Sequence, residues 1–256
     1  CTVLSATPHM AISTLLSRSF GFAPKRHSAY AGLFAVGTVM VFDEAHIQRQ
    51  AVKTARSVAF LVSQDSQRGG VTSQNLTVVE MTATPSDDMD TSLAVTVGDA
   101  DVSDPFSPIA RVLTAPKVVS VTRCSDTGKD IPETLAESAL EMRRSVGEGT
   151  LAVIANTVGS ALKVTKTLRK EGLRVVPITG RVRGADRESL FTAFPGVLTS
   201  GGSPDVDVVV ATQTIEVGID ADFHGMVTEL ASGDALAQRF GRVNRHGKRS
   251  TPAPIV

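Results

Sequence analysis

Short apolar runs rich in β-branched residues recur along the chain, and stretches with helical periodicity separate them. The runs lie at 38–42, 76–81, 118–122, 151–155, 174–178 and 206–211. Because neighbouring positions in each run are apolar, both faces of each strand need cover, which is typical of parallel strands flanked by helices. Helices are predicted at 132–146, 158–171 and 185–194. The pattern therefore predicts an α/β fold built on parallel sheets.

A turn-rich segment at 99–108 divides the chain into two α/β halves. The segment contains few periodic apolar residues, and strand and helix signals resume on both sides of it. A chain of 256 residues is long enough for two domains of ordinary size. We therefore expect one domain at 1–113 and a second at 114–256.

Composition limits the classes of function that the chain can serve. Hydrophobic residues make up 42% and charged residues 20%, as in folded globular proteins. The 26 basic residues equal the 26 acidic ones, so any binding of nucleic acid must depend on local groups rather than on overall charge. The two cysteines have no metal-site spacing, and no apolar run reaches the roughly 18 residues that span a membrane. We expect a cytoplasmic protein that does not contact membranes.

The first predicted strand leads directly into an acid pair, in the sequence Asp43-Glu44-Ala45-His46. At the carboxyl end of a parallel strand these acids lie where such sheets bind ligands. One carboxylate can hold Mg²⁺ on ATP through water, and its neighbour can orient and deprotonate the attacking water. A solvated strand end explains a bare acid pair equally well, but the apolar run before it and Ala-His after it favour a nucleotide site.

Thr82-Ala83-Thr84-Pro85 follows the second predicted strand. The hydroxyls of Thr82 and Thr84 can hydrogen-bond a neighbouring carboxylate or His46, which would connect the nucleotide site to the rest of the domain. Threonines are common at strand ends, so the motif alone is a weak signal. Its place one strand after the acid pair strengthens the interpretation.

The run at 208–220 contains a buried strand, then polar groups, a glycine and an acid. Thr212 can donate to a nucleic-acid phosphate. Gly218 allows close backbone approach. Asp220 can bond either a ribose or an arginine motif. An ordinary junction between a strand and a helix is the alternative interpretation.

Gln238-Arg239-Phe240-Gly241-Arg242-Val243-Asn244-Arg245 lies near the end of the chain. We predict a helix over 235–247, with Gln238, Arg242 and Arg245 on one face. The planar guanidinium suits phosphate, and arginines stabilise charge on transferring phosphoryl groups. A solvated basic face is the alternative, which Gly241 and the basic residues at 246–249 make less favoured.

In this order the four motifs resemble motifs II, III, V and VI of superfamily 2 helicases. The chain also resembles the helicase region of the CRISPR-associated helicase-nuclease that is the effector of type I systems, with Ala31-Gly32-Leu33 similar to the type I-G variant. Three stretches carry this closer resemblance: Asn156-Thr157-Val158, Thr179-Gly180-Arg181 followed by Asp186-Arg187, and Thr212-Gln213 with Glu216.

The resemblance implies two RecA-like domains, the first truncated at its N-terminus, that together bind ATP and Mg²⁺. Asp43 would then serve the metal and Glu44 would be the catalytic base, with Arg245 as arginine finger and Arg242 as a second phosphate contact. The remaining nucleotide-site residues would be Gly218, Asp220 and Gln238. The residues that couple this site to DNA would be His46, Thr82 and Thr84.

The same resemblance implies that single-stranded DNA is the track, with the CRISPR surveillance complex (Cascade) as a partner. Contacts to the DNA backbone position a strand without reading its sequence, as a translocating motor requires. The residues that match such backbone contacts are Thr7, Thr179, Gly180, Arg181 and Thr212.

The chain departs from the family pattern in one important respect. No Gly-x-x-x-x-Gly-Lys-Ser/Thr run occurs, so the phosphate-binding loop would have to precede Cys1, where no initiator methionine stands. We expect this segment alone to hydrolyse ATP negligibly. The five histidines are scattered and suggest no nuclease metal site.

Two alternatives remain open at the level of sequence. Another superfamily 2 helicase, acting on RNA or in repair, would carry the same motifs. A nucleic-acid-binding module that has lost hydrolysis would keep the fold, although the intact Asp43, Glu44, Arg242 and Arg245 argue against it.

Overall fold

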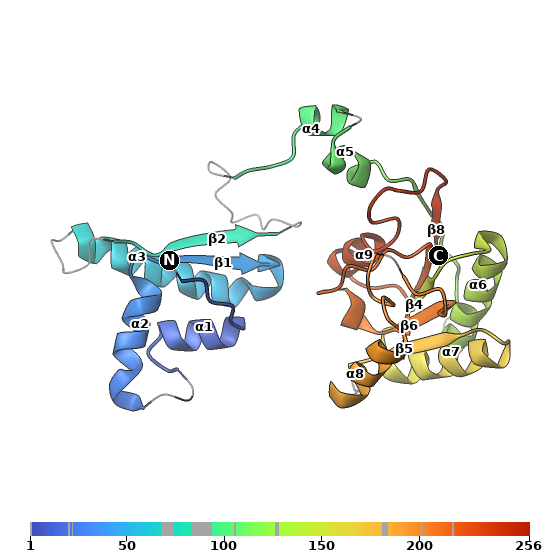
Figure 1. The fold of residues 1–256 in the computed structure, drawn as a ribbon, viewed down its shortest axis with the longest axis horizontal. Coiled ribbons are helices and arrows are strands. Elements are labelled where there is room, and N and C mark those ends of the chain that lie inside the picture. Colours follow the sequence, from blue (N-terminus) through green and yellow to red (C-terminus); the bar gives the residue numbers. More distant parts are fainter. Residues whose placement is uncertain are drawn as a thin grey trace. The chain divides into compact units, whose positions relative to one another are not determined.

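The computed structural model describes residues 2–19, 21, 23–67, 74–82, 94–104, 106–125, 128–180, 184–200, 202–216 and 218–256. The chain forms two compact units, 1–94 and 95–256, which are described separately (Figure 1). Helices α4 (Asp99–Ser103) and α5 (Pro108–Leu113) belong to the second unit, although the sequence led us to expect a boundary after residue 113. The reason is that α5 packs closely against the turn at Gly247 of the second unit. The approach is so close that a side-chain carbon on Gly247 would overlap the carbonyl of Arg111 in α5.

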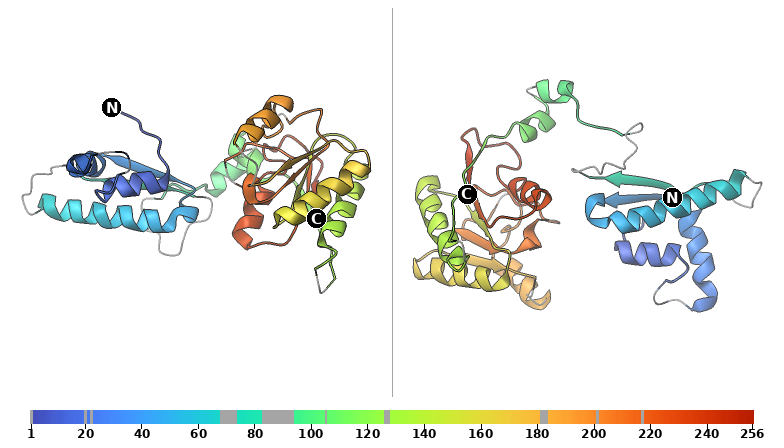
Figure 2. Two further views of the ribbon diagram at one scale, coloured as in Figure 1. Left: turned by 90° about the horizontal axis from the view of Figure 1, so that it is seen from below. Right: turned by 180° about the vertical axis from the view of Figure 1, so that it is seen from behind.

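The first unit is built on two parallel strands, β1 (Val39–Asp43) and β2 (Thr77–Met81). Helix α3 runs along one face of the pair (Figure 2). Met40 and Phe42 of β1 pack there with Val52 of α3 and with the rest of the core cluster. The other helical elements are α1 (Pro8–Leu15), η1 (Pro24–Arg26), α2 (His27–Ala35), η2 (Ala45–Gln48) and α3 (Arg49–Gln67) itself.

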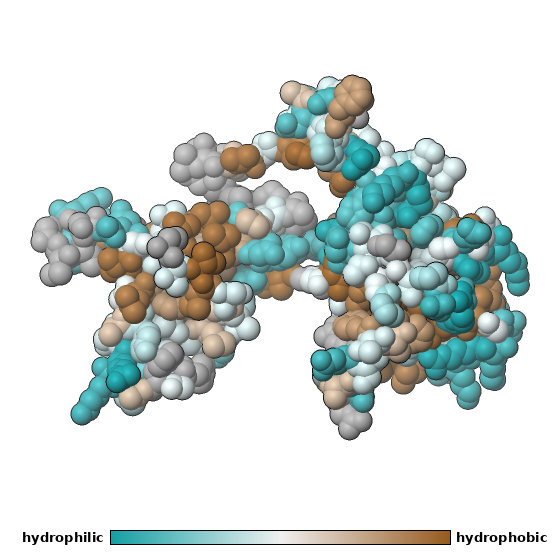
Figure 3. Space-filling model, in the orientation of Figure 1, coloured by the Kyte–Doolittle hydropathy of each residue, from teal (hydrophilic) through white to brown (hydrophobic). Residues whose placement is uncertain are grey.

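The opposite face of this strand pair is apolar and exposed. Val41 and Val79 are partners in the strand register, and both lie on this face together with Val39 and Met81. Figure 3 shows apolar side chains on the surface of the first unit over these strands. Among the described residues, the core of the first unit therefore lies on one side of its sheet only.

The second unit contains a six-stranded sheet in which every described pairing is parallel. Its strand order is β3-β8-β7-β4-β6-β5. The parallel α/β architecture predicted from the sequence is thus confirmed. The strands are β3 (Lys117–Val119), β4 (Leu151–Ile154), β5 (Val175–Ile178), β6 (Val208–Ala211), β7 (Gly225–Thr228) and β8 (Ala253–Ile255).

Helices cover both faces of the large sheet, as its apolar strands require. Every residue of β4 and β6 is buried, and successive residues enter two different clusters. One cluster contains residues of α6 (Ile131–Val146) and α7 (Val158–Lys170). The other contains Ile215 of η4 (Gln213–Ile215), and residues of α8 (Gly184–Ala193) and α9 (Gly233–Phe240) pack against it. In the described part of the chain, no helix is long and apolar enough to cross a membrane.

The helix predicted at 235–247 ends seven residues early, because α9 stops at Phe240 and Gly241 is its C-cap. Val243 instead forms a bridge with Phe223, and Asn244 has a left-handed φ of 44°. The side chain of Asn244 hydrogen-bonds the backbone of Arg249 in both directions, which fixes the turn. Gln238, Arg242 and Arg245 therefore do not share one helix face.

Asp207 anchors the amino end of β6 through two arginines. Its carboxylate accepts hydrogen bonds from Arg174 Nε and Nη2 at 3.1 and 3.0 Å and from Arg143 Nη2 at 3.0 Å. The hydrogen bonds from Arg174 hold the pKa of Asp207 below its usual value, against the opposing effect of burial. Because the folded-state pKa is lowered, this carboxylate stabilises the fold above its unfolded pKa of about 4 and stops doing so as pH falls below it.

We expect Asp207→Asn to lower the free energy of unfolding by about 2 to 3 kcal/mol at pH 7, since charge-assisted hydrogen bonds to a carboxylate are lost. The difference from the parent should shrink as pH falls from 5 to 3. Urea denaturation followed by circular dichroism at several pH values measures both effects. A difference that is constant or grows on acidification would contradict this account of Asp207.

Candidate functional site

The acid pair of the first unit forms a tight turn at the carboxyl end of β1. Asp43 Oδ1 accepts a hydrogen bond from the Glu44 amide at 3.0 Å, and the Asp43 carbonyl accepts one from Gln48 Nε2 at 2.9 Å. Glu44 has a left-handed backbone, with φ 52° and ψ 48°. A residue other than glycine in this region costs about 1 kcal/mol or more, and such strain clusters at functional sites. The turn fixes two adjacent carboxylates where a parallel sheet binds ligands.

His46 connects this turn to the end of β2. Its Nδ1 lies 3.1 Å from Thr82 Oγ1 and 3.5 Å from Glu44 Oε2. The structure thus brings together the histidine, the carboxylate and the first threonine of the motif that the sequence singled out. Thr84 lies outside the described residues. The coupling role of these groups stays a prediction.

The single carboxylate of Asp43 suits a Mg²⁺ ion that takes most of its ligands from water and phosphates. It does not suit a metal ion whose ligands all come from the protein. Its side chain is exposed and supplies carboxylate oxygen, the ligand type that Mg²⁺ prefers. Nowhere in the described ranges do three His, Cys, Asp or Glu side chains gather as a metal site. Mg²⁺ usually keeps several waters and takes substrate phosphates as ligands, so one carboxylate is enough for this ion.

Threonine hydroxyls line the carboxyl edge of the sheet in the second unit. Thr179 follows β5 and Thr212 follows β6, and the register that pairs Ile178 with Ala211 sets these threonines side by side. They are 9% and 5% exposed, respectively. Within the described part of the chain, no hydrogen bond engages either hydroxyl, so both can donate to a ligand. Gly180 is exposed beside them, whereas Arg181 lies outside the described residues.

Thr7 of the first unit is the N-cap of α1. Its Oγ1 accepts a hydrogen bond from the Met10 amide at 3.4 Å, and the residue is exposed. An N-cap uses the hydroxyl as an acceptor, so its own proton is available to another group. The structure is compatible with the DNA-backbone contact that the resemblance implies and does not test it.

Arg242 supports the segment that follows β6. The residue is 4% exposed, and its Nη1 and Nη2 donate to the carbonyls of Ile219 and Glu216, each at 2.6 Å. Loop carbonyls need such donors when they are shielded from water. In this structure Arg242 therefore contacts its own chain, and the phosphate contact expected from the sequence stays a prediction.

Arg245 pairs with Asp220 at the surface. Arg245 Nε lies 2.9 Å from Asp220 Oδ1, and the two side chains are 37% and 60% exposed. The arginine motif is thus a partner of Asp220 in this structure, and a contact of Asp220 with a ribose stays a prediction. Gly218 has φ +77°, and no atom of the described residues lies near the place of a side chain, so the left-handed backbone is what requires glycine there. Gln238 is partly buried on α9.

Several residues of this region were missed by the sequence analysis. Asp222 is buried and accepts hydrogen bonds from the Arg245 amide at 2.9 Å and from Arg249 Nη2. Burial lowers the pKa of Lys117, and the charge of Arg245 lowers it further, while Asp222 opposes both. The sequence signal that could have revealed Asp222 is its spacing from Asp220, with one alanine between the two acids. After the bend at Gly218 the two carboxylates have different partners: Asp220 pairs with Arg245 Nε, and Asp222 accepts from the Arg245 amide and Arg249.

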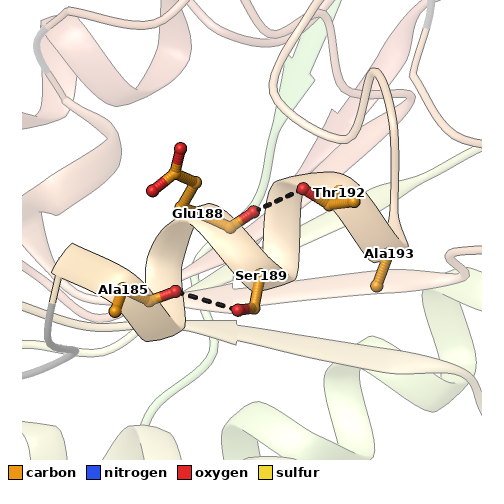
Figure 4. Close-up of a pocket in the computed structure, with 5 residues that line it drawn as sticks. All are labelled: Ala185, Glu188, Ser189, Thr192 and Ala193. Carbon is orange, nitrogen blue, oxygen red and sulfur yellow. Dashed lines mark hydrogen bonds between the residues drawn. The ribbon is translucent and has the colours of Figure 1, made fainter.

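A shallow hollow lies on α8 and involves none of the candidate residues. Its lining consists of Ala185, Glu188, Ser189, Thr192 and Ala193 (Figure 4). The Ser189 hydroxyl donates to the Ala185 carbonyl at 3.0 Å, and that of Thr192 donates to Glu188 at 2.9 Å. Because the helix backbone already engages both hydroxyl protons, we assign no chemistry to this hollow.

Comparison with known proteins gives consistent matches. Residues 147–248 match the family described as CRISPR-associated nuclease/helicase Cas3, C-terminal, and this range contains every candidate residue of the second unit. The CRISPR-associated helicase Cas3 of Thermoproteus tenax is 35% identical over 99 residues, which are 38% of this chain and 17% of that protein. The Cas3 endonuclease/helicase of Escherichia coli is 41% identical over 46 residues, which are 18% of this chain and 5% of that protein.

Solved structures share the fold. The crystal structure of T. fusca Cas3–AMPPNP matches with a TM-score of 0.61 at 22% identity, over 90% of this chain and 30% of that one. The DUF1998 helicase MrfA bound to DNA and AMPPNP matches with a TM-score of 0.60 at 15% identity, over 97% of this chain and 33% of that one. Residues 147–248 are thus similar to the C-terminal region of Cas3, and the two parallel-sheet units share their fold with solved helicase structures.

Proposed function

We propose that the chain supplies ATP-hydrolysing and nucleic-acid-binding parts of an ATP-dependent DNA helicase of the CRISPR-associated type. The chain spans 17% of the T. tenax relative, so the activity of the whole protein is part of the proposal. One observation supports it above the others. The segment that follows Thr212 at the strand edge is hydrogen-bonded to both Arg242 and Arg245 of the arginine motif.

In the first unit, we assign the chemical step to the acid turn. Asp43 would hold Mg²⁺, which shields phosphate charge when it is bound. Glu44 would orient the attacking water and take its proton. His46 and Thr82 would couple conformational changes of this turn to the end of β2. The resemblance assigns the same role to Thr84, which lies beyond the described residues.

In the second unit, the arginine motif would recognise the phosphates. Arg245 is the better candidate for the arginine finger, because it is partly exposed and its partner Asp220 is exposed too. Arg242 would move from the loop carbonyls to a phosphate or would act by holding the loop. Gln238 and Gly218 complete the set that the resemblance assigns to the nucleotide.

The nucleic acid would bind along the carboxyl edge of the large sheet. In the second unit, Thr179, Gly180 and Thr212, with Arg181, would contact phosphates of single-stranded DNA. The resemblance assigns a contact of the same kind to Thr7 in the first unit. A partnership with the CRISPR surveillance complex rests on the family resemblance alone.

Oligonucleotide binding tests the strand edge. We expect the double variant Thr179→Val/Thr212→Val to bind a fluorescein-labelled dT15 about 5- to 150-fold more weakly than the parent, since each lost hydroxyl contact contributes about 0.5 to 1.5 kcal/mol. The loss should be the same for a mixed-sequence strand, because backbone contacts carry no sequence information. Fluorescence anisotropy at fixed salt concentration measures both affinities.

Thr150→Val is the matched control for this experiment. Thr150 lies at the opposite edge of the sheet, before β4, and its hydroxyl donates to the Val206 carbonyl at 3.0 Å. This variant should bind the oligonucleotide as tightly as the parent does. Equal affinities for the parent and the double variant would contradict the assignment of this edge.

A further inference from the structure

Arg239 is the largest fully buried side chain among the described residues, with only 1% of its surface exposed. It lies between Gln238 and the two arginines of the motif, yet it is not one of the residues assigned to the nucleotide. A buried charge is costly unless it is paired and hydrogen-bonded, so its surroundings indicate what it does.

Its guanidinium donates four hydrogen bonds and forms an ion pair with Glu216. Nε and Nη2 lie 2.9 and 2.8 Å from Glu216 Oε1. Nη1 donates to Thr228 Oγ1 at 2.8 Å and to the Glu229 carbonyl at 2.9 Å. Nη2 also donates to Asn156 Oδ1 at 3.1 Å. Lysine has only three donors and no planar fork, so it cannot replace these contacts.

Asn156 extends the hydrogen-bond network of Arg239 to the carboxyl edge of the sheet. It follows β4, and its amide and Nδ2 donate to Glu229 Oε2 and to the Leu230 carbonyl, each at 2.8 Å. Its own carbonyl accepts a hydrogen bond from Gln213 Nε2 at 3.4 Å. Gln213 directly follows Thr212, so this part of the network adjoins the edge proposed to receive DNA.

Glu216 carries the network to the arginine motif. Its carboxylate binds Arg239, while its backbone carbonyl accepts the hydrogen bond from Arg242 Nη2. A shift of Glu216 therefore changes the surroundings of both arginines.

We propose that Arg239 is a positioning residue that holds the strand edge at Asn156 directly and, through Glu216, the loop bound by Arg242, so that both keep one arrangement. The DNA-related part of this inference rests on the proposed function. The effect of Arg239 on DNA binding follows from the two strand ends, those of β4 and β7, and the one loop that its guanidinium joins.

Glu216→Gln tests this role in the 256-residue chain, because it removes the charge and keeps the shape. We expect it to bind fluorescein-labelled dT15 about 2- to 30-fold more weakly, the range typical of residues that act through others. Asp207→Asn is the matched control, since it breaks another arginine–carboxylate pair of the same unit at the opposite edge of the sheet. It should lower the melting temperature and leave the affinity unchanged, as a merely structural residue would.

Amide hydrogen exchange of the same variants provides a readout that needs no ligand. In Glu216→Gln we expect faster exchange at 154–157 and at 218–222 together, and in Asp207→Asn at neither. Faster exchange in Glu216→Gln confined to 216 and α9, or absent, would overturn the inference even if the affinity fell. A parent chain that does not bind dT15 would contradict the proposed function, and the exchange pattern alone would then decide the role of Arg239.

Discussion

Arg245→Ala is expected to lower single-stranded-DNA-stimulated ATP hydrolysis about 10³- to 10⁵-fold, the range that an arginine finger contributes. The assay requires a polypeptide in which a phosphate-binding loop precedes this chain, since the 256 residues contain no such motif. The fold should tolerate the change, because the Arg245–Asp220 pair is exposed and surface pairs contribute about 0 to 1 kcal/mol. Turnover and thermal melting of the same preparation measure the two effects separately.

Two further arginine variants complete this experiment. Arg242→Ala should lower both turnover and melting temperature, because it removes the donors of the Ile219 and Glu216 carbonyls. Arg144→Ala removes an exposed arginine of α6 and is the neutral control. If Arg245→Ala were as active as Arg144→Ala, Arg245 would not be the arginine finger.

Glu44→Gln should reduce ATP turnover in the same polypeptide about 10²- to 10⁴-fold, the usual contribution of a general base. Glutamine keeps the shape of the side chain and cannot take the proton from water. Affinity for dT15 should stay within about two-fold of the parent, because the nucleic-acid contacts that we propose use backbone-binding groups elsewhere.

Glu80→Gln is the matched control for Glu44→Gln. Glu80 lies on β2 of the same unit and pairs with Arg56. Its replacement should alter stability slightly and turnover by less than about three-fold, since its side chain pairs with Arg56, which is not a proposed site residue. Equal losses in both variants would mean that Glu44 acts through folding and not as a base.

The periodic apolar runs were sufficient to predict the architecture of the larger sheet. β4 and β6 are apolar at every position and buried at every position, so the signal for covered parallel strands is strong. β7 and β8 were missed because both are short and contain residues that disfavour strands: Gly225 opens β7, and Pro254 lies within β8. Tertiary pairing with their neighbours outweighs these local preferences.

The candidate site was predictable as a set of motifs but not as a set of roles. Arg239, Arg242 and Arg245 lie within seven residues of one another, and sequence spacing on a helix assigned the last two to one face. The chain leaves the helix at Gly241, so the three guanidinium groups meet different surroundings: a partly buried carboxylate, loop carbonyls and an exposed acid. Only the long-range contacts distinguish these roles.

The most direct test of the motor assignment is ATP hydrolysis with and without single-stranded DNA, measured for the loop-bearing polypeptide and for its Glu44→Gln variant. We predict that DNA accelerates the parent several-fold and that the variant stays at background under both conditions. ATP turnover that DNA does not change and that is equal in the parent and the variant would contradict the assignment. That result would favour a nucleic-acid-binding module without hydrolysis.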